Sequence, residues 1–145
     1  MKKLILSLLG AAFGGGNTLS AQTITKNEDG KYSLSVGHVT LTVDAQKGGK
    51  IVSYRYDDKE ILSQTKIPNS FGSTFWTSPQ SEWNWPPVPE YDTKPFNAEV
   101  AGDKLILTGE KSKRFGYRVR KELTTDKKDN AIVITYTIIN ESGET

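Results

Sequence analysis

The sequence of 145 residues contains no cysteine and a single histidine, His38. Without cysteine the chain forms no disulfide, so its stability must come from packing, and it cannot be anchored to lipid through a thiol. A zinc site needs cysteines or several histidines at short spacings, so we expect no metal or other cofactor. His38 opens a strand-like segment and has no acidic neighbour in sequence, which is typical of an exposed structural histidine rather than a catalytic one.

Long apolar runs are also missing, because the longest, residues 4–13, is too short to cross a membrane, which takes about 20 residues. The run follows Lys2 and Lys3 and leads through a small, polar stretch to Leu19-Ser20-Ala21. This is the pattern of a secretory signal peptide. We therefore interpret residues 1–21 as a signal peptide and expect a periplasmic or secreted protein without a membrane span. The alternative interpretation of this run is a short buried helix.

An excess of one charge is absent from the remaining chain. Residues 22–145 carry 17 basic and 17 acidic side chains, because Lys2 and Lys3 are the charged residues of the first 21. A neutral, mixed surface provides no electrostatic attraction to nucleic acid or to anionic lipid, so we expect neither as a partner. These 124 residues are enough to bury one hydrophobic core.

Short alternating segments dominate what is present. Apolar and polar residues alternate with a period of two, separated by turns rich in glycine and aspartate, in segments 32–36, 38–43, 50–56, 96–100, 105–108, 117–123 and 131–139. No segment after residue 21 shows an apolar stripe of helical period with caps. The pattern predicts an all-β fold, an antiparallel β-sandwich, with a β-barrel as the alternative.

One stretch of these strands and turns is strongly basic. Arg118 and Arg120 alternate with Val119 and Lys121, and further cations precede them at Lys111, Lys113 and Arg114. We interpret the whole stretch as an exposed strand face. A clamp for an anionic ligand is the alternative.

Segment 71–91 holds all three tryptophans and four of the six prolines. Proline fixes φ and removes a backbone donor, so the second half of this segment cannot form an interior strand. We expect a long, stiff loop. Loops of this length that carry aromatic residues are commonly functional.

The tryptophans of this loop predict a carbohydrate site. A flat indole can stack on the C–H face of a sugar ring, and nearby polar side chains can hydrogen-bond to the sugar hydroxyls. The candidate ligand-binding residues are Trp76, Gln80, Glu82, Trp83, Asn84 and Trp85. In extended backbone Trp83 and Trp85 would share one face, which suits a binding platform or, alternatively, a small core that plugs the end of the sandwich.

Three acidic residues of the same region could in principle supply the paired carboxylates of a glycoside hydrolase. They are Glu82, Glu90 and Asp92. Acidic residues in loops are usually solvated, and solvation without a catalytic role is our interpretation.

Several motifs together resemble the galactose mutarotase-like superfamily, and within it an uncharacterised exported group common in Bacteroidetes. The motifs are GGKI at 48–51, Tyr54, EIL at 60–62, FGSTFWTSPQ at 71–80, WNWPP at 83–87 and YTIINES at 136–142. The resemblance implies a β-supersandwich that binds sugars on a concave face, with residues 22–145 as the N-terminal half of a longer domain. Thr74 departs from the arginine that sugar-acting relatives often carry, and the central region lacks their histidine.

These observations leave three hypotheses about function. The first is an exported carbohydrate-binding β-sandwich that contacts mono- or oligosaccharides through the aromatic loop. The second, implied by the resemblance, is an aldose 1-epimerase whose catalytic residues lie beyond residue 145. The third is a structural or protein-interaction module. A strand as apolar as segment 131–139 would also favour self-association if it lay at a sheet edge.

Overall fold

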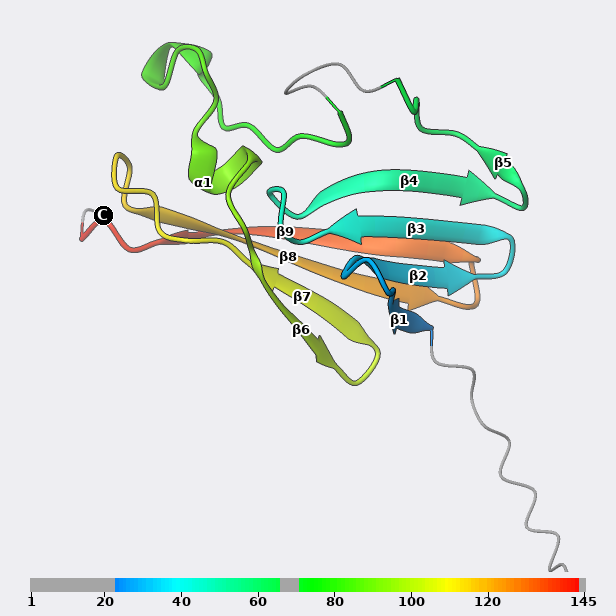
Figure 1. The fold of residues 1–145 in the computed structure, drawn as a ribbon. Helices are drawn as coiled ribbons and strands as arrows, with labels where there is room; N and C mark the ends of the chain where they lie inside the picture. The colour runs from blue at the N-terminus through cyan, green and yellow to red at the C-terminus, as the bar shows by residue number, and fades with distance from the viewer. Residues whose placement is uncertain (1–22, 66–70, 144–145) are drawn as a thin grey trace, which may run out of the picture.

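Two antiparallel sheets stack face to face in the computed structural model, which describes residues 23–65 and 71–143 (Figure 1). The first sheet has the order β1-β2-β3-β4-β5, and the second has the order β6-β7-β8-β9. The predicted all-β antiparallel sandwich is therefore confirmed. The predicted signal peptide at 1–21 lies outside the described residues.

The strands agree closely with the alternating segments. In the five-stranded sheet they are β1 Ile24–Lys26, β2 Tyr32–Val36, β3 Val39–Asp44, β4 Lys50–Tyr56 and β5 Lys59–Glu60. In the four-stranded sheet they are β6 Asn97–Ala101, β7 Lys104–Thr108, β8 Tyr117–Asp126 and β9 Ala131–Asn140. The sequence pattern missed β1, because three residues are too few to show a period of two.

The core lies between the sheets, where the inward-facing side chains of both meet. Leu34 and Val43 of the first sheet and Leu105 and Val119 of the second are fully enclosed. Each side chain of this kind that leaves water contributes about 1.5–3 kcal/mol, which makes this interface the main stabilising feature of the fold.

Lys121 corrects the expectation that the basic stretch is an exposed strand face. Its side chain is buried on the inner face of β8, opposite Leu107 of β7. Its Nζ donates hydrogen bonds to the carbonyl oxygens of Gly48 and Gly49, at 2.7 and 3.1 Å. Burial lowers the pKa of Lys121 to about 8; the nearby Asp92 carboxylate raises it and the Lys50 ammonium lowers it further.

The turn between β3 and β4 is held against a distant part of the chain. Gly48 has φ of 66° and donates its N–H to the Lys94 carbonyl oxygen at 3.0 Å. A Cβ at this position would lie 2.0 Å from the Asp92 carbonyl oxygen, so glycine is required both by the left-handed backbone and by the close approach. The turn thereby positions the segment that follows the tryptophans.

Segment 71–96 leads into the second sheet and contains two short helices, η1 Gln80–Glu82 and α1 Pro89–Asp92 (Figure 1). Pro89 is the first residue of α1, a position where proline's fixed φ suits a helix and its missing N–H costs nothing. Tyr91 and Phe96 enter the core and pin the segment down. Among the described residues no helix is long and apolar enough to cross a membrane.

Candidate functional site

Trp83 anchors the aromatic loop in the hydrophobic core. Its side chain is buried, and the indole Nε1 donates a hydrogen bond to the Thr77 carbonyl oxygen at 2.9 Å. The Arg114 guanidinium, from the loop between β7 and β8, donates to the carbonyl oxygens of Trp83 and Glu82. The loop is therefore fixed from inside the core and from the neighbouring loop.

Trp76 and Trp85 form an exposed corner above this anchor. Trp76 is 46% exposed and Trp85 is 64% exposed. Their ring centroids lie 5.9 Å apart at an interplanar angle of 87°, and Trp76 makes a second edge contact with Trp83. Edge-to-face contacts of this kind are favourable for aromatic pairs and hold each ring in a defined orientation. We call this pair the Trp76–Trp85 corner.

The expectation that Trp83 and Trp85 share a face is wrong. Asn84 between them has φ of 56°, a left-handed conformation that breaks the extended backbone. Trp83 consequently points into the core and Trp85 into solvent. Of the two predicted alternatives, the small core describes Trp83, and the exposed platform describes Trp76 and Trp85.

The three polar candidates lie on the exposed part of the same loop. Gln80 and Glu82 belong to η1, and Asn84 lies two positions after its last residue. All three are exposed to solvent, and the Gln80 carbonyl oxygen accepts the backbone N–H groups of Trp83 and Asn84. The structure thus brings all six candidates into one loop, with Trp83 as the member that is removed from solvent.

Asp92 and Glu90 are buried, which corrects the expectation that they are solvated loop acids. The Asp92 Oδ1 lies 3.1 Å from the Lys50 Nζ and accepts the indole N–H of Trp76 at 3.2 Å. The Glu90 carboxylate pairs with Lys94 at 2.9 Å. Each carboxylate therefore forms an ion pair with a lysine, and Asp92 also orients Trp76. The sequence could not show this, because Lys50 is far from Asp92 along the chain.

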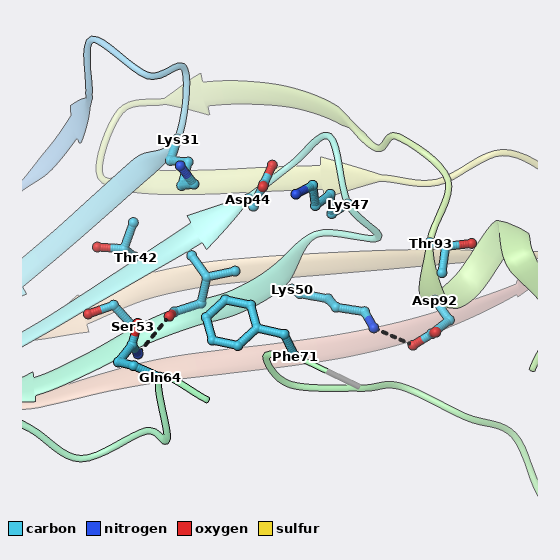
Figure 2. Close-up of a pocket in the computed structure, with 11 residues that line it drawn as sticks. Lys31, Thr42, Asp44, Lys47, Lys50, Ser53, Gln64, Phe71, Asp92 and Thr93 are labelled. Carbon is cyan, nitrogen blue, oxygen red and sulfur yellow. Dashed lines mark hydrogen bonds and ion pairs between the residues drawn. The ribbon is translucent and has the colours of Figure 1, made fainter. Parts of the chain in front are cut away.

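A pocket of about 680 Å³ lies beside this ion pair, on the outer face of the five-stranded sheet (Figure 2). Thr42, Asp44 and Ser53 line its floor from β3 and β4, and Gln64 and Phe71 lie across it. Figure 2 shows Lys31, Asp44 and Lys47 at one end and the Lys50–Asp92 pair at the other. Because Asp92 also binds Trp76, the pocket and the Trp76–Trp85 corner meet at one residue.

The pocket could not be predicted from the sequence. Its floor consists of residues on two strands, β3 and β4, and its cover comes from Gln64 and Phe71, which follow those strands along the chain. Such a site has no local motif. The only available signal was the polar face of β3, which alternation shows but which is also typical of any solvated sheet surface.

His38 is exposed, in agreement with the interpretation of a structural histidine. It is not without an acidic partner, however, because Nδ1 lies 2.6 Å from the Oδ1 of Asp57, a residue of the turn that joins β4 and β5. The ring also stacks on Tyr56 with centroids 5.5 Å apart. Both contacts are explained by the antiparallel pairing of β3 with β4, which brings the two strand ends together.

Within the described parts of the chain no cluster of three or more histidine, cysteine, aspartate or glutamate residues could hold a metal ion. Comparisons with protein-family models, with curated proteins and with solved structures find no match to this chain. The arrangement of its own residues therefore carries the functional argument.

Proposed function

We propose that this protein binds carbohydrate through the Trp76–Trp85 corner. The observation that carries the proposal is the combination of high exposure and fixed orientation in these two indoles. Burial of apolar surface stabilises a protein by about 25 cal/mol for each Å² removed from water, and the two exposed indoles do not contribute this stabilisation in the free protein. A ligand with an apolar face, such as the C–H face of a sugar ring, would bury their exposed surface on binding.

The fixed orientation of the two indoles supports binding, because their side chains lose little conformational entropy when a ligand binds. Trp76 is held by its hydrogen bond to Asp92, and Asp92 is itself held by Lys50. Trp85 is held against Trp76 by the edge contact. Each long side chain that is immobilised on binding costs about 0.5–1.5 kcal/mol, and this corner avoids most of that cost.

Exposed polar groups beside the corner suit the hydroxyl groups of a sugar. Gln80 and Asn84 each offer an amide donor and acceptor, and the Glu82 carboxylate offers acceptors. The predicted signal peptide and the predicted resemblance to a sugar-binding superfamily would fit this assignment. An epimerase activity requires catalytic residues beyond residue 145, as the resemblance implies, and the binding proposal does not depend on it.

Titration with glucose, galactose, mannose and their short oligomers, followed by calorimetry and tryptophan fluorescence, tests the proposal. We expect saturable binding and a change in tryptophan emission. Trp85→Ala should weaken binding by roughly 2- to 13-fold, which corresponds to the 0.5–1.5 kcal/mol of an aromatic contact.

The matched control is Tyr56→Ala, which removes another aromatic ring of similar exposure, 53%, far from the corner along the chain. This variant should bind sugar as the parent does. Absence of heat and of any fluorescence change with the whole panel would refute the proposal. Loss of a protein complex in Trp85→Ala, with no sugar binding in the parent, would instead identify a protein-interaction module.

A further inference from the structure

The two sheets of the sandwich differ in width, and this leaves a groove at one edge. Across the core β2 packs on β8 and β9, and β3 packs on β9. The first sheet continues with β4 and β5, whereas the second ends at β9. On the inner face of β4, Tyr54 is consequently 38% exposed and Tyr56 is 53% exposed, although the paired Leu41 is buried.

The groove beneath β4 has a volume of about 450 Å³ and an uncharged lining. Leu41, Ile51 and Tyr54 line it from the first sheet, and Ile132 and Ile134 line it from β9. No aspartate, glutamate, lysine, arginine or histidine lines it among the described residues. The Phe75 ring stacks on Tyr136 of β9, with the ring centroids 5.1 Å apart.

β9 forms the floor of the groove and is an unprotected edge strand. It pairs with β8 over ten residues without a register shift, and the structure assigns it no second strand within the described ranges. Every second residue of such a strand points its N–H and C=O groups away from its partner. Between residues 131 and 139 there is no charge, no proline and no bulge, the devices by which proteins usually block edge pairing.

The other sheet edges are short or carry charge, which sets β9 apart. β1 has three residues and includes Lys26, and β5 has two residues, Lys59 and Glu60. β6 has five residues and includes Glu99. The fold therefore protects three edges and leaves the fourth, the one beside the apolar groove, open.

We propose that the groove is a docking site for one extended peptide strand of a partner protein. Such a strand would pair with β9 and insert apolar side chains at alternate positions beneath β4. This accounts for two features at once, the open backbone edge of β9 between residues 131 and 139 and the uncovered inner face of β4. An apolar small molecule would cover the side chains but leave the backbone groups unpaired.

A second copy of this chain fits the groove less well than a single strand. Antiparallel pairing of β9 with β9 of a second copy needs a two-fold axis perpendicular to the sheet. Both five-stranded sheets would then lie on the same side of the joined sheet. β4 and β5 of each copy extend past β9 on that side, so they would compete for the same space.

The test uses a fluorescent synthetic peptide of alternating valine and threonine with a lysine at each end. Anisotropy should show saturable binding to the full chain, and hydrogen exchange of the β9 amides should slow when the peptide is bound. Tyr54→Lys should weaken binding about tenfold or more, because an ammonium group loses hydration in an apolar groove. Val100→Lys, on β6 at the opposite edge of the same sheet and 40% exposed in the parent residue, is the control and should bind normally.

Three results would overturn the proposal. The first is no binding of the peptide to the folded parent protein. The second is equal binding of the same peptide with alternate amides N-methylated, which would show an apolar site without strand pairing. The third is a stable dimer of the parent protein that Tyr54→Lys abolishes, which would make a second copy the occupant. Circular dichroism of each variant confirms that the sandwich is intact.

Discussion

At the scale of single residues, the most unusual feature is an ammonium group inside the sandwich. Lys121 Nζ satisfies the carbonyl oxygens of Gly48 and Gly49 and lies 4.9 Å from the centre of the Phe96 ring. These contacts compensate in part for the loss of hydration. The lowered pKa shows that compensation is incomplete, because a fully stabilised ammonium would keep its ordinary pKa.

The first prediction concerns the pH dependence that Lys121 causes. Its pKa is about 8 in the folded protein and 10.5 for the free side chain, so the unfolded chain binds more protons between these values. The free energy of unfolding should therefore rise with pH in this window. Relative to Lys121→Met, the parent should gain about 3 kcal/mol between pH 8 and 10.5, since each pKa unit corresponds to 1.36 kcal/mol.

Urea unfolding at several pH values measures this gain. Lys104→Met is the control, because Lys104 lies on the same sheet with its side chain 49% exposed, and its removal should leave the pH profile unchanged. A constant difference between the parent and Lys121→Met across the window would show that the lysine titrates normally.

At the scale of elements, the β3–β4 turn and α1 depend on each other. Gly48 contacts the Asp92 carbonyl oxygen, Lys50 pairs with the Asp92 carboxylate, and Asp92 orients Trp76. A glycine turn of one sheet thereby determines where an exposed indole of the aromatic loop lies. The breaking of a buried ion pair of this kind typically costs about 3–5 kcal/mol, so the connection is a strong one.

The second prediction compares two glycines that share a left-handed backbone. Gly48→Ala places a Cβ 2.0 Å from the Asp92 carbonyl oxygen, whereas a Cβ at Gly102 meets nothing within 4 Å. Gly102→Ala should cost about 1–2 kcal/mol, the strain of a left-handed residue alone. Gly48→Ala should cost several times as much, or prevent folding, and should shift the emission of Trp76.

Thermal and urea unfolding of both variants provide the measurement. Similar losses of stability in the two would show that the turn can move away from α1 at little cost. The contact between the turn and the aromatic loop would then be incidental to the position of Trp76.

At the scale of the whole molecule, one core joins both sheets and the aromatic loop. Leu34 of the first sheet, Leu105 of the second and Trp83 of the loop belong to the same buried cluster. Neither sheet has a second continuous apolar face, because serine, threonine and charged residues separate the few aliphatic side chains of the outer faces, such as Ile106 and Val133. A sheet that is separated from the other sheet would therefore expose its apolar face to water and lose the burial that stabilises it.

The third prediction follows from this single core. Urea unfolding monitored by far-ultraviolet circular dichroism and by tryptophan fluorescence should give coincident transitions, because strand content and the environment of Trp83 are lost together. Trp85→Ala, which removes an exposed indole, should leave the midpoint of the dichroism transition unchanged. Two separate transitions would mean that the aromatic loop or one sheet unfolds independently.

The strand pattern was predictable from the sequence, and the physical reason is local. Successive side chains of a strand point to opposite faces, so alternation in β2, β3 and β8 reveals both the strand and the residues that face the core. Turns at Gly48-Gly49 and at Asp57-Asp58 follow from the backbone freedom of glycine and the turn preference of aspartate. The clustering of tryptophans and prolines likewise marked the loop that became the candidate site.

The sequence by itself thus determined the fold class, the strands and the loop that carries the aromatic residues. Only the tertiary structure decided which polar and aromatic side chains are buried. Lys121 and Asp92 are buried. Of the two tryptophans that flank Asn84, Trp83 is buried and Trp85 is exposed. The physical reason is that a period of two reports only which side of a strand a residue faces. Whether that side is covered, and by which charge, depends on segments far away along the chain.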